Sequence, residues 1–250
     1  DSYMKGKIAQ RRYYDRVLPT LKAVMDEHHR QTGRRYDVVA PYRLEDADYA
    51  IVGAGSMMET AESAVDYMRD RGLKVGLLHI TCFRPFPSIE IVEALRNVKA
   101  VSVLERLDVP MMQSNPFLAE IKAAFTDAAA RTPGYPDLPA MPRFFGGSAG
   151  LGSRDVRAGD FLSVVRNMRS DSPRHYFTLG IDHETSLPIT EDPDVRSEGS
   201  FSMRGHSVGG FGSVTTNKVI ATIAGEVFGM DVQAYPKYGS EKKGLPTTYY

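Results

Sequence analysis

The stretch of the chain best suited to chemistry is residues 204–218, RGHSVGGFGSVTTNK, in which glycines follow a predicted strand and open a predicted helix. Such a turn lets backbone N–H groups approach phosphate oxygens, with the positive end of the helix dipole behind them. The dinucleotide fingerprint would need glycine at Thr215, and the Walker fingerprint would need its lysine earlier than Lys218. Two interpretations therefore stay open: a phosphate cradle, or a strand-to-helix contact that needs small residues.

A second segment suited to anions is residues 235–244, YPKYGSEKKG, which places three lysines in a glycine-bounded loop. Lysine carries a compact charge that suits phosphate. On spacing alone a solvated surface loop is the commoner case, but two such segments close together in the sequence favour a joint role. The turn at residues 150–155, GLGSRD, is better explained as an N-cap of the helix after it.

Other kinds of site have little support in the sequence. The six histidines show no metal-ligand spacing, and neither a Ser-His-Asp arrangement nor a pair of catalytic carboxylates can be argued, so we predict neither catalytic nor metal-binding residues. The Gly-Asp-Gly signature of thiamine diphosphate sites is missing, since Gly159 and Asp160 are followed by Phe161. Cys82 lies at an apolar strand end and is interpreted as inert.

Composition limits the remaining functional classes. With 42% hydrophobic and 25% charged residues, the 250-residue chain has enough apolar material for folded cores. Lys+Arg and Asp+Glu number 31 each, which argues against binding to nucleic acid. The single cysteine excludes an internal disulfide and an iron–sulfur cluster held by this chain alone, and it fits a reducing compartment such as the cytoplasm. No stretch reaches the roughly 20 apolar residues that would span a membrane.

The elements that would position these segments follow from periodicity. Short apolar runs at 49–54, 75–80 and 100–104 alternate with helical-period segments, which predicts an α/β domain with a parallel sheet over residues 1–131. The four prolines of residues 132–145 indicate a linker. Residues 146–250 then form a second α/β domain that looks truncated. The predicted elements of this second domain are a helix over 155–168, a strand over 175–181, and a helix over 213–228.

At these residues the chain resembles the 2-oxoacid:ferredoxin oxidoreductases, the pyruvate synthase family. The segments similar to the family's second domain, which is like the C-terminal domain of transketolases, are 42–48, 55–57, 83–87 and 103–106. The segments similar to its gamma domain are 150–153, 209–212 and 238–244. The resemblance implies a transketolase C-terminal-like α/β domain that helps to dimerise the enzyme, followed by a gamma-type domain that binds coenzyme A.

The resemblance also implies a reaction. The family oxidatively decarboxylates a 2-oxoacid with coenzyme A to acyl-CoA, carbon dioxide and reduced ferredoxin or flavodoxin, and pyruvate is favoured here over 2-oxoglutarate. Thiamine diphosphate, Mg²⁺ and [4Fe-4S] clusters are expected in other domains or subunits, so the chain should not be catalytic alone. The coenzyme A-binding residues carried over from the family are Gly210, Phe211, Gly212, Ser213, Val214 and Lys242, with Lys243 as a substitute for Lys242.

Two further expectations complete the sequence analysis. Because the chain lacks an initial methionine and ends in the β-prone run TTYY, we expect a piece of a longer polypeptide or a processed subunit of a larger assembly. The alternative function is a non-catalytic coenzyme A- or nucleotide-binding scaffold module that reuses the same folds.

Overall fold

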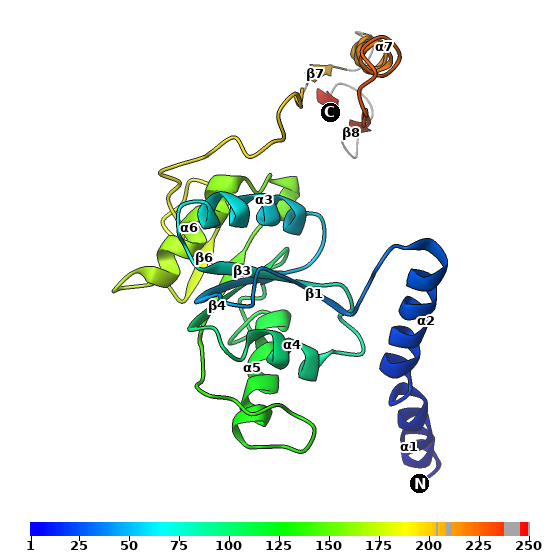
Figure 1. Cartoon of the computed structure of the whole chain (residues 1–250), viewed down its shortest axis with the longest axis vertical. Coiled ribbons are helices and arrows are strands. Elements are labelled where there is room, and N and C mark those ends of the chain that lie inside the picture. Colours follow the sequence, from blue (N-terminus) through cyan, green and yellow to red (C-terminus); the bar gives the residue numbers. More distant parts are fainter. Residues whose placement is uncertain (204, 209–211, 238–245, 250) are drawn as a thin grey trace. The chain divides into compact units, whose positions relative to one another are not determined.

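The structure is a computed structural model that describes residues 1–203, 205–208, 212–237 and 246–249 (Figure 1). The chain divides into two compact units, Asp1–Val195 and Arg196–Tyr250, here called unit 1 and unit 2. Among the described residues, no helix is both long enough and apolar enough to cross a membrane.

Unit 1 is built on a six-stranded sheet with the order β1-β3-β2-β4-β5-β6. Its strands are β1 (Val39–Tyr42), β2 (Tyr49–Gly53), β3 (Val75–Ile80), β4 (Ala100–Glu105), β5 (Arg143–Ser148) and β6 (Tyr176–Thr178). Only the β1–β3 pair in this sheet is antiparallel. The predicted parallel sheet is therefore confirmed, with Ile51, Leu77 and Val101 on three of its four inner strands.

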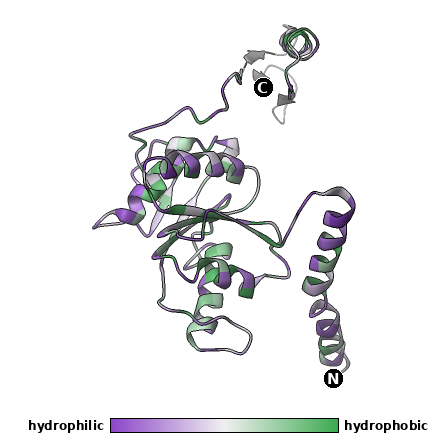
Figure 2. Cartoon of the chain, in the orientation of Figure 1, coloured by the Kyte–Doolittle hydropathy of each residue, from purple (hydrophilic) through white to green (hydrophobic). Residues whose placement is uncertain are grey.

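Helices cover both faces of this sheet, with α3 and α6 on one side and α4 and α5 on the other (Figure 1). Their bounds are α3 (Met57–Arg69), α4 (Ser88–Leu95), α5 (Pro116–Ala129) and α6 (Ala158–Arg169). Each face has its own hydrophobic core, and Figure 2 shows hydrophobic residues concentrated along the sheet between them. Because β2, β3 and β4 are buried on both faces, their sequences are continuous apolar runs rather than alternating ones.

The division of the chain differs from the predicted one. Residues 132–145 connect α5 to β5 inside unit 1, and β5, α6 and β6 complete the first sheet instead of opening a second domain. A Cβ at Gly147 would lie 2.4 Å from the Phe177 ring and 2.7 Å from Leu104, so this glycine is needed for packing between strands. The proline-rich connector has the composition of an interdomain linker. It nevertheless lies inside unit 1, because β5, which follows it, pairs with β4, which precedes it.

Two further helices precede the sheet, α1 (Ser2–Tyr14) and α2 (Val17–Thr32). The chain leaves α2 at Gly33, which has a φ of 74° in the left-handed region that favours glycine. Neither helix has a buried residue, and Lys22 of α2 forms an ion pair of 2.8 Å with Glu90 of α4.

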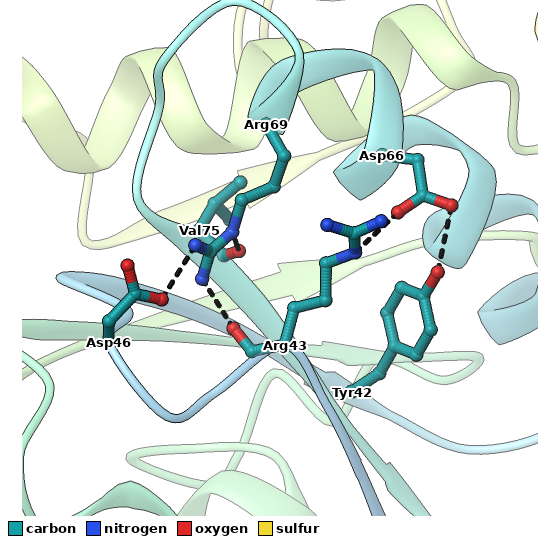
Figure 3. Close-up of polar contacts among 6 residues, drawn as sticks. All are labelled: Tyr42, Arg43, Asp46, Asp66, Arg69 and Val75. Atoms are coloured by element: carbon teal, nitrogen blue, oxygen red, sulfur yellow. Dashed lines mark hydrogen bonds and ion pairs between the residues drawn. The ribbon is translucent and has the colours of Figure 1, made fainter.

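A polar network fastens the segment after β1 to the end of α3 and the start of β3 (Figure 3). Arg69 donates from Nε to the carbonyl oxygen of Val75 at 2.7 Å and from a terminal nitrogen to that of Arg43 at 2.5 Å. Its other terminal nitrogen lies 2.6 Å from a carboxylate oxygen of Asp46. The Arg69 side chain is only 14% exposed, so one guanidinium serves two main-chain carbonyls in a largely dry site.

The same network holds an unusual backbone turn. Arg43 has a φ of 51°, which is unfavourable for a residue with a side chain. Its Nε lies 2.7 Å from Asp66, which also accepts a hydrogen bond of 2.8 Å from the Tyr42 hydroxyl. A Cβ at Gly76 would lie 2.5 Å from the Arg43 carbonyl oxygen, so glycine in β3 makes room for this turn.

Unit 2 contains β7 (Gly205–Val208), α7 (Ser213–Glu226), β8 (Pro236–Lys237) and β9 (Pro246–Tyr249). Its strands form an antiparallel sheet with the order β7-β9-β8. The predicted strand and helix are present on either side of residues 209–211, and the helix begins at Ser213 and ends two residues before the predicted limit.

Candidate functional site: the edge of the unit 2 sheet

The glycine turn ends at a helix N-terminus. Gly212 is the N-cap of α7 and has a φ of 73°, a left-handed conformation that side chains rarely adopt. The first N–H groups of a helix have no acceptor within it, and the aligned peptide dipoles give this end a partial positive charge. The first turn of α7 contains no acidic residue. This end of the helix is therefore electrostatically suited to an external anion.

Strand pairing brings the strand ends that flank the glycine turn and the lysine segment to the same edge of the sheet. β9 lies between β7 and β8 and is antiparallel to both, with Val208 opposite Pro246 and Lys237 opposite Thr248. The carboxyl ends of β7 and β8 and the amino end of β9 therefore share one edge. The connection to α7 and the connection from β8 to β9 both start there, although about 30 residues of sequence separate them.

The predicted coenzyme A-binding residues fall into two groups. Gly212 is exposed, and Ser213 and Val214 are half-buried in the first turn of α7. The remaining four positions, Gly210, Phe211, Lys242 and Lys243, lie outside the described residues.

Sequence analysis gave Asn217 no role. Its side-chain Nδ2 donates to the Ser213 carbonyl oxygen at 2.9 Å, one helical turn back. A Cβ at Gly205 would lie 3.1 Å from the same nitrogen, so the Asn217 amide packs over the first residue of β7. The only available sequence signal was an amide-bearing residue in the second turn of a helix, which by itself is uninformative.

An apolar cavity of about 290 Å³ lies elsewhere in unit 2. Its walls are residues 201–203, one face of α7 and residues 230–235. The first and last of these segments precede β7 and β8, and Asn217 in the second turn of α7 is also among the lining residues.

In unit 1, by contrast, the chain's own carboxylates occupy helix N-termini. Glu105, buried at the end of β4, accepts hydrogen bonds from the N–H groups of Phe117 at 2.8 Å and Leu118 at 3.2 Å at the start of α5. Asp192 accepts from the N–H of Gly159 at 2.9 Å at the start of α6 and pairs with Arg157 at 3.0 Å. These two helix ends are already satisfied, which leaves α7 as the better candidate for an external anion.

The turn at residues 150–155 neither provides the N-cap of the next helix nor belongs to the second unit. It lies in unit 1 between β5 and α6 and includes a short 3₁₀ turn, Leu151–Ser153. The N-cap of α6 is Arg157, whose N–H donates to the Asp160 carboxylate at 2.8 Å. The predicted N-cap is thus misplaced, because the capping contact is made by residues just after the glycines.

Metal centres find no support in the described part of the chain, where no group of three His, Cys, Asp or Glu side chains could hold an ion. The lone cysteine, Cys82, is buried with its Sγ 3.5 Å from the carbonyl oxygens of Arg84 and Pro85. An iron–sulfur cluster held by four thiolates does not fit this chain.

Burial of Glu105 leads to a testable pH dependence. Desolvation raises the pKa of this carboxyl above its usual 4.5, although the two N–H groups of α5 oppose the shift. When a carboxyl binds its proton more tightly in the folded state than in the unfolded state, the free energy of unfolding falls as pH rises from about 4.5 through the raised pKa. We expect Glu105→Gln to flatten this decline in the free energy of unfolding, measured by urea denaturation from pH 4 to 8.

A residual slope should remain in the variant, because burial also raises the pKa of Asp160. Identical pH profiles for wild type and Glu105→Gln would show that Glu105 has the same proton affinity in the folded and unfolded states.

The fold and the site together define an α/β protein whose second unit has a glycine-capped helix N-terminus, an arrangement suited to phosphate groups. The strand ends that flank residues 209–211 and 238–245 lie at one edge of its sheet. Two family models match the chain. One describes the core domain II of pyruvate:ferredoxin oxidoreductase and matches residues 47–135. The other describes pyruvate ferredoxin/flavodoxin oxidoreductase and matches residues 202–250. Both models describe pyruvate:ferredoxin or flavodoxin oxidoreductases, and together they match more than half of the chain.

Curated relatives match along almost the whole chain. It is 30% identical over 249 residues to a pyruvate-flavodoxin oxidoreductase of Enterobacter agglomerans, covering 98% of this chain and 20% of that protein. It is 29% identical over 248 residues to the pyruvate:ferredoxin oxidoreductase of Moorella thermoacetica, again covering 98% and 20%. The chain thus spans about a fifth of the length of these relatives.

Among solved structures, a 2-oxoglutarate:ferredoxin oxidoreductase from Magnetococcus marinus matches 54% of this chain and 20% of its own, with 18% identity and a TM-score of 0.37. A likeness this loose supports no conclusion about ligands.

Proposed function

We propose that this chain is the part of a 2-oxoacid:ferredoxin oxidoreductase that binds coenzyme A. The observation that supports the proposal is the pairing of Val208 with Pro246, because it brings the strand ends next to the glycine turn and the lysine segment to the same sheet edge. Each segment is suited to phosphate for its own reason, the first through its glycine backbone and the second through its lysines. The match of residues 202–250 to the oxidoreductase family model agrees with this assignment.

In this proposal, the phosphates of coenzyme A meet the backbone of the glycine turn. Gly210, Phe211, Gly212, Ser213 and Val214 supply N–H donors and the partial charge of the α7 N-terminus. Lys242, or Lys243 beside it, adds a full positive charge. Since the chain has no net charge, a local site of this kind is what would attract an anion.

The larger protein would oxidise a 2-oxoacid, with pyruvate the favoured substrate, in the cytoplasm. Carbon dioxide leaves, coenzyme A takes up the acyl group, and two electrons pass to ferredoxin or flavodoxin. Thiamine diphosphate supplies the electron sink for decarboxylation, and with Mg²⁺ and [4Fe-4S] clusters it belongs to other domains or subunits. Unit 1 contributes to dimerisation. Assays of the full-length protein with pyruvate and 2-oxoglutarate distinguish the two substrates, and inactivity with both would favour a binding scaffold.

Calorimetric titration of coenzyme A into the chain tests the binding role. Lys242→Ala is expected to weaken binding by about 1.5–3 kcal/mol, the range for a hydrogen bond to a charged group. If Lys243 binds the phosphate instead, Lys243→Ala should have the larger effect. Lys5→Ala, which removes the same charge from exposed helix α1, is the control and should bind normally. If both single variants and the double variant bind as tightly as wild type, the loop is only a solvated surface.

A further inference from the structure

We infer that the exposed apolar side of α7 is an interaction surface, and that it packs against an apolar surface of the oxidoreductase that lies outside these 250 residues. This surface, here called the α7 apolar face, consists of Val219, Ile220 and Ile223 in the helix and of Val227 and Phe228 directly after it. The inference rests on the proposed function, in which the chain is one part of a larger oxidoreductase. It needs neither coenzyme A nor the glycine turn.

The apolar residues of α7 surround more of the helix than one buried side requires. Successive residues of a helix turn by about 100°. From Lys218 to Phe228, this rotation collects all the apolar side chains within an arc of about 200°. The polar residues Lys218, Thr222 and Glu226 lie on the rest of the circumference. A helix with one side in a core needs an apolar stripe of only roughly 100°, so the wider arc predicts burial against two surfaces.

One of these two surfaces is present in unit 2. α7 packs against β7 and β9, and on that side the Asn217 amide lies over Gly205. Ala224 is the one buried residue among those of unit 2 whose exposure the structure describes. The α7 apolar face stays open, with Val227 70% exposed and Phe228 73% exposed. The second surface is therefore missing from the described part of unit 2.

The open apolar surface continues beyond the helix. Ile220 of the α7 apolar face also lines the cavity of unit 2, together with Ala221 and Ala224. Other lining residues are large, apolar or aromatic, and themselves exposed: Phe201, Met203, Val232 and Tyr235. Extended apolar patches of this kind on soluble proteins mark interaction surfaces, whereas scattered single residues do not.

Charge and chain length indicate the kind of partner. The α7 apolar face has no charged side chain, and Asp231 is the single charged residue among the described residues that line the cavity. A strongly charged partner would find no complementary charge here. Curated relatives match 98% of this chain, yet the match covers only 20% of each relative. The larger proteins of this kind therefore contain much further polypeptide, and an apolar part of it fits this face.

Alkylation of introduced cysteines tests the inference in the full-length oxidoreductase. Ile223→Cys places a thiol on the α7 apolar face, and Thr222→Cys is the matched control on the adjacent, polar side. Maleimide labelling, located by peptide mass spectrometry, is compared between the full-length protein and the 250-residue chain. We expect Ile223→Cys to react about tenfold or more slowly in the full-length protein, because a buried thiol is inert. Thr222→Cys should react at similar rates in both.

Val227→Cys repeats the comparison at a more exposed position of the same face, so the result does not depend on one variant folding. Equal rates in the two proteins at both positions overturn the inference. Slow labelling of Ile223→Cys already in the 250-residue chain also overturns it, and a dependence on protein concentration would then assign the face to a second copy of this chain.

Failure of the proposed function gives a different result. The labelling requires neither coenzyme A nor turnover. If the full-length protein neither binds coenzyme A nor oxidises a 2-oxoacid, the proposed function is wrong, and the labelling rates still decide whether the α7 apolar face is covered.

Discussion

Arg69→Met is expected to lower the free energy of unfolding of unit 1 by about 3–5 kcal/mol. Methionine keeps the apolar stem but leaves the carbonyl oxygens of Val75 and Arg43 without their donors. Each lost bond from a charged donor in a largely dry site costs about 1.5–3 kcal/mol. The left-handed turn at Arg43 also loses a contact that holds it (Figure 3).

The ion pair with Asp46 contributes little to this total. Asp46 is 56% exposed, and such pairs are worth about 0–1 kcal/mol. Asp46→Asn should therefore cost less than about 1 kcal/mol, which separates the ion pair from the bonds to the main chain.

Urea denaturation followed by circular dichroism measures both variants. Arg71→Met is the matched control, because Arg71 is exposed and bonds to only one carbonyl oxygen, that of Tyr67. A cost for Arg69→Met no larger than for Arg71→Met would mean that the Arg69 network adds nothing to stability.

Gly159→Ala is expected to destabilise unit 1 by about 2–4 kcal/mol. The added Cβ would lie 2.5 Å from the carbonyl oxygen of Glu191, 2.7 Å from Ile189 and 2.9 Å from the Asp192 carboxylate. Since the nearest of these atoms is main chain, the segment around Glu191 must shift away from α6. The bond from the Gly159 N–H to Asp192 is then weakened or lost.

The higher helix propensity of alanine offsets only part of the destabilisation expected for Gly159→Ala. Alanine favours a helix over glycine by about 1 kcal/mol, whereas overpacking and a lost bond to a carboxylate each cost about 1–3 kcal/mol. Gly6→Ala in α1, where nothing lies within 4 Å of the new Cβ, should be neutral or slightly stabilising.

Thermal and urea denaturation give the stability change, and limited proteolysis reports whether residues 188–195 have become accessible. A Gly159→Ala protein as stable as wild type, with that segment equally protected, would show that the close approach at Gly159 can relax without loss.

Local sequence patterns were sufficient to predict the strands and the helix start whose residue types are most restricted. β2, β3 and β4 were predictable because a strand buried on both faces must be apolar along its length. The start of α7 at Ser213 was predictable because Gly212 occupies a conformation that few other residues tolerate. The Glu105 and Asp192 contacts had no such signal, since their partners lie 12 to 33 residues away in the sequence.

The unit boundary was wrongly placed for the same reason. Prolines at 132–145 and glycines at 146–150 are typical of linkers and anion loops. Whether β5 extends the first sheet depends on its pairing with β4, Ala100 opposite Arg143 through Glu105 opposite Ser148. Such pairings are formed by main-chain groups, which every residue except proline carries in the same form.

The sequence by itself determined which segments can meet an anion, because glycine freedom and lysine charge are properties of single residues. It also placed the strand before the glycine turn and the helix after it. Only the tertiary structure decided that the turn and the lysine loop start from one edge, through the pairing of β9 with both β7 and β8. The physical reason is that strands from distant segments pair through main-chain groups, which are the same in every residue except proline, so the sequence of one strand does not identify its partner.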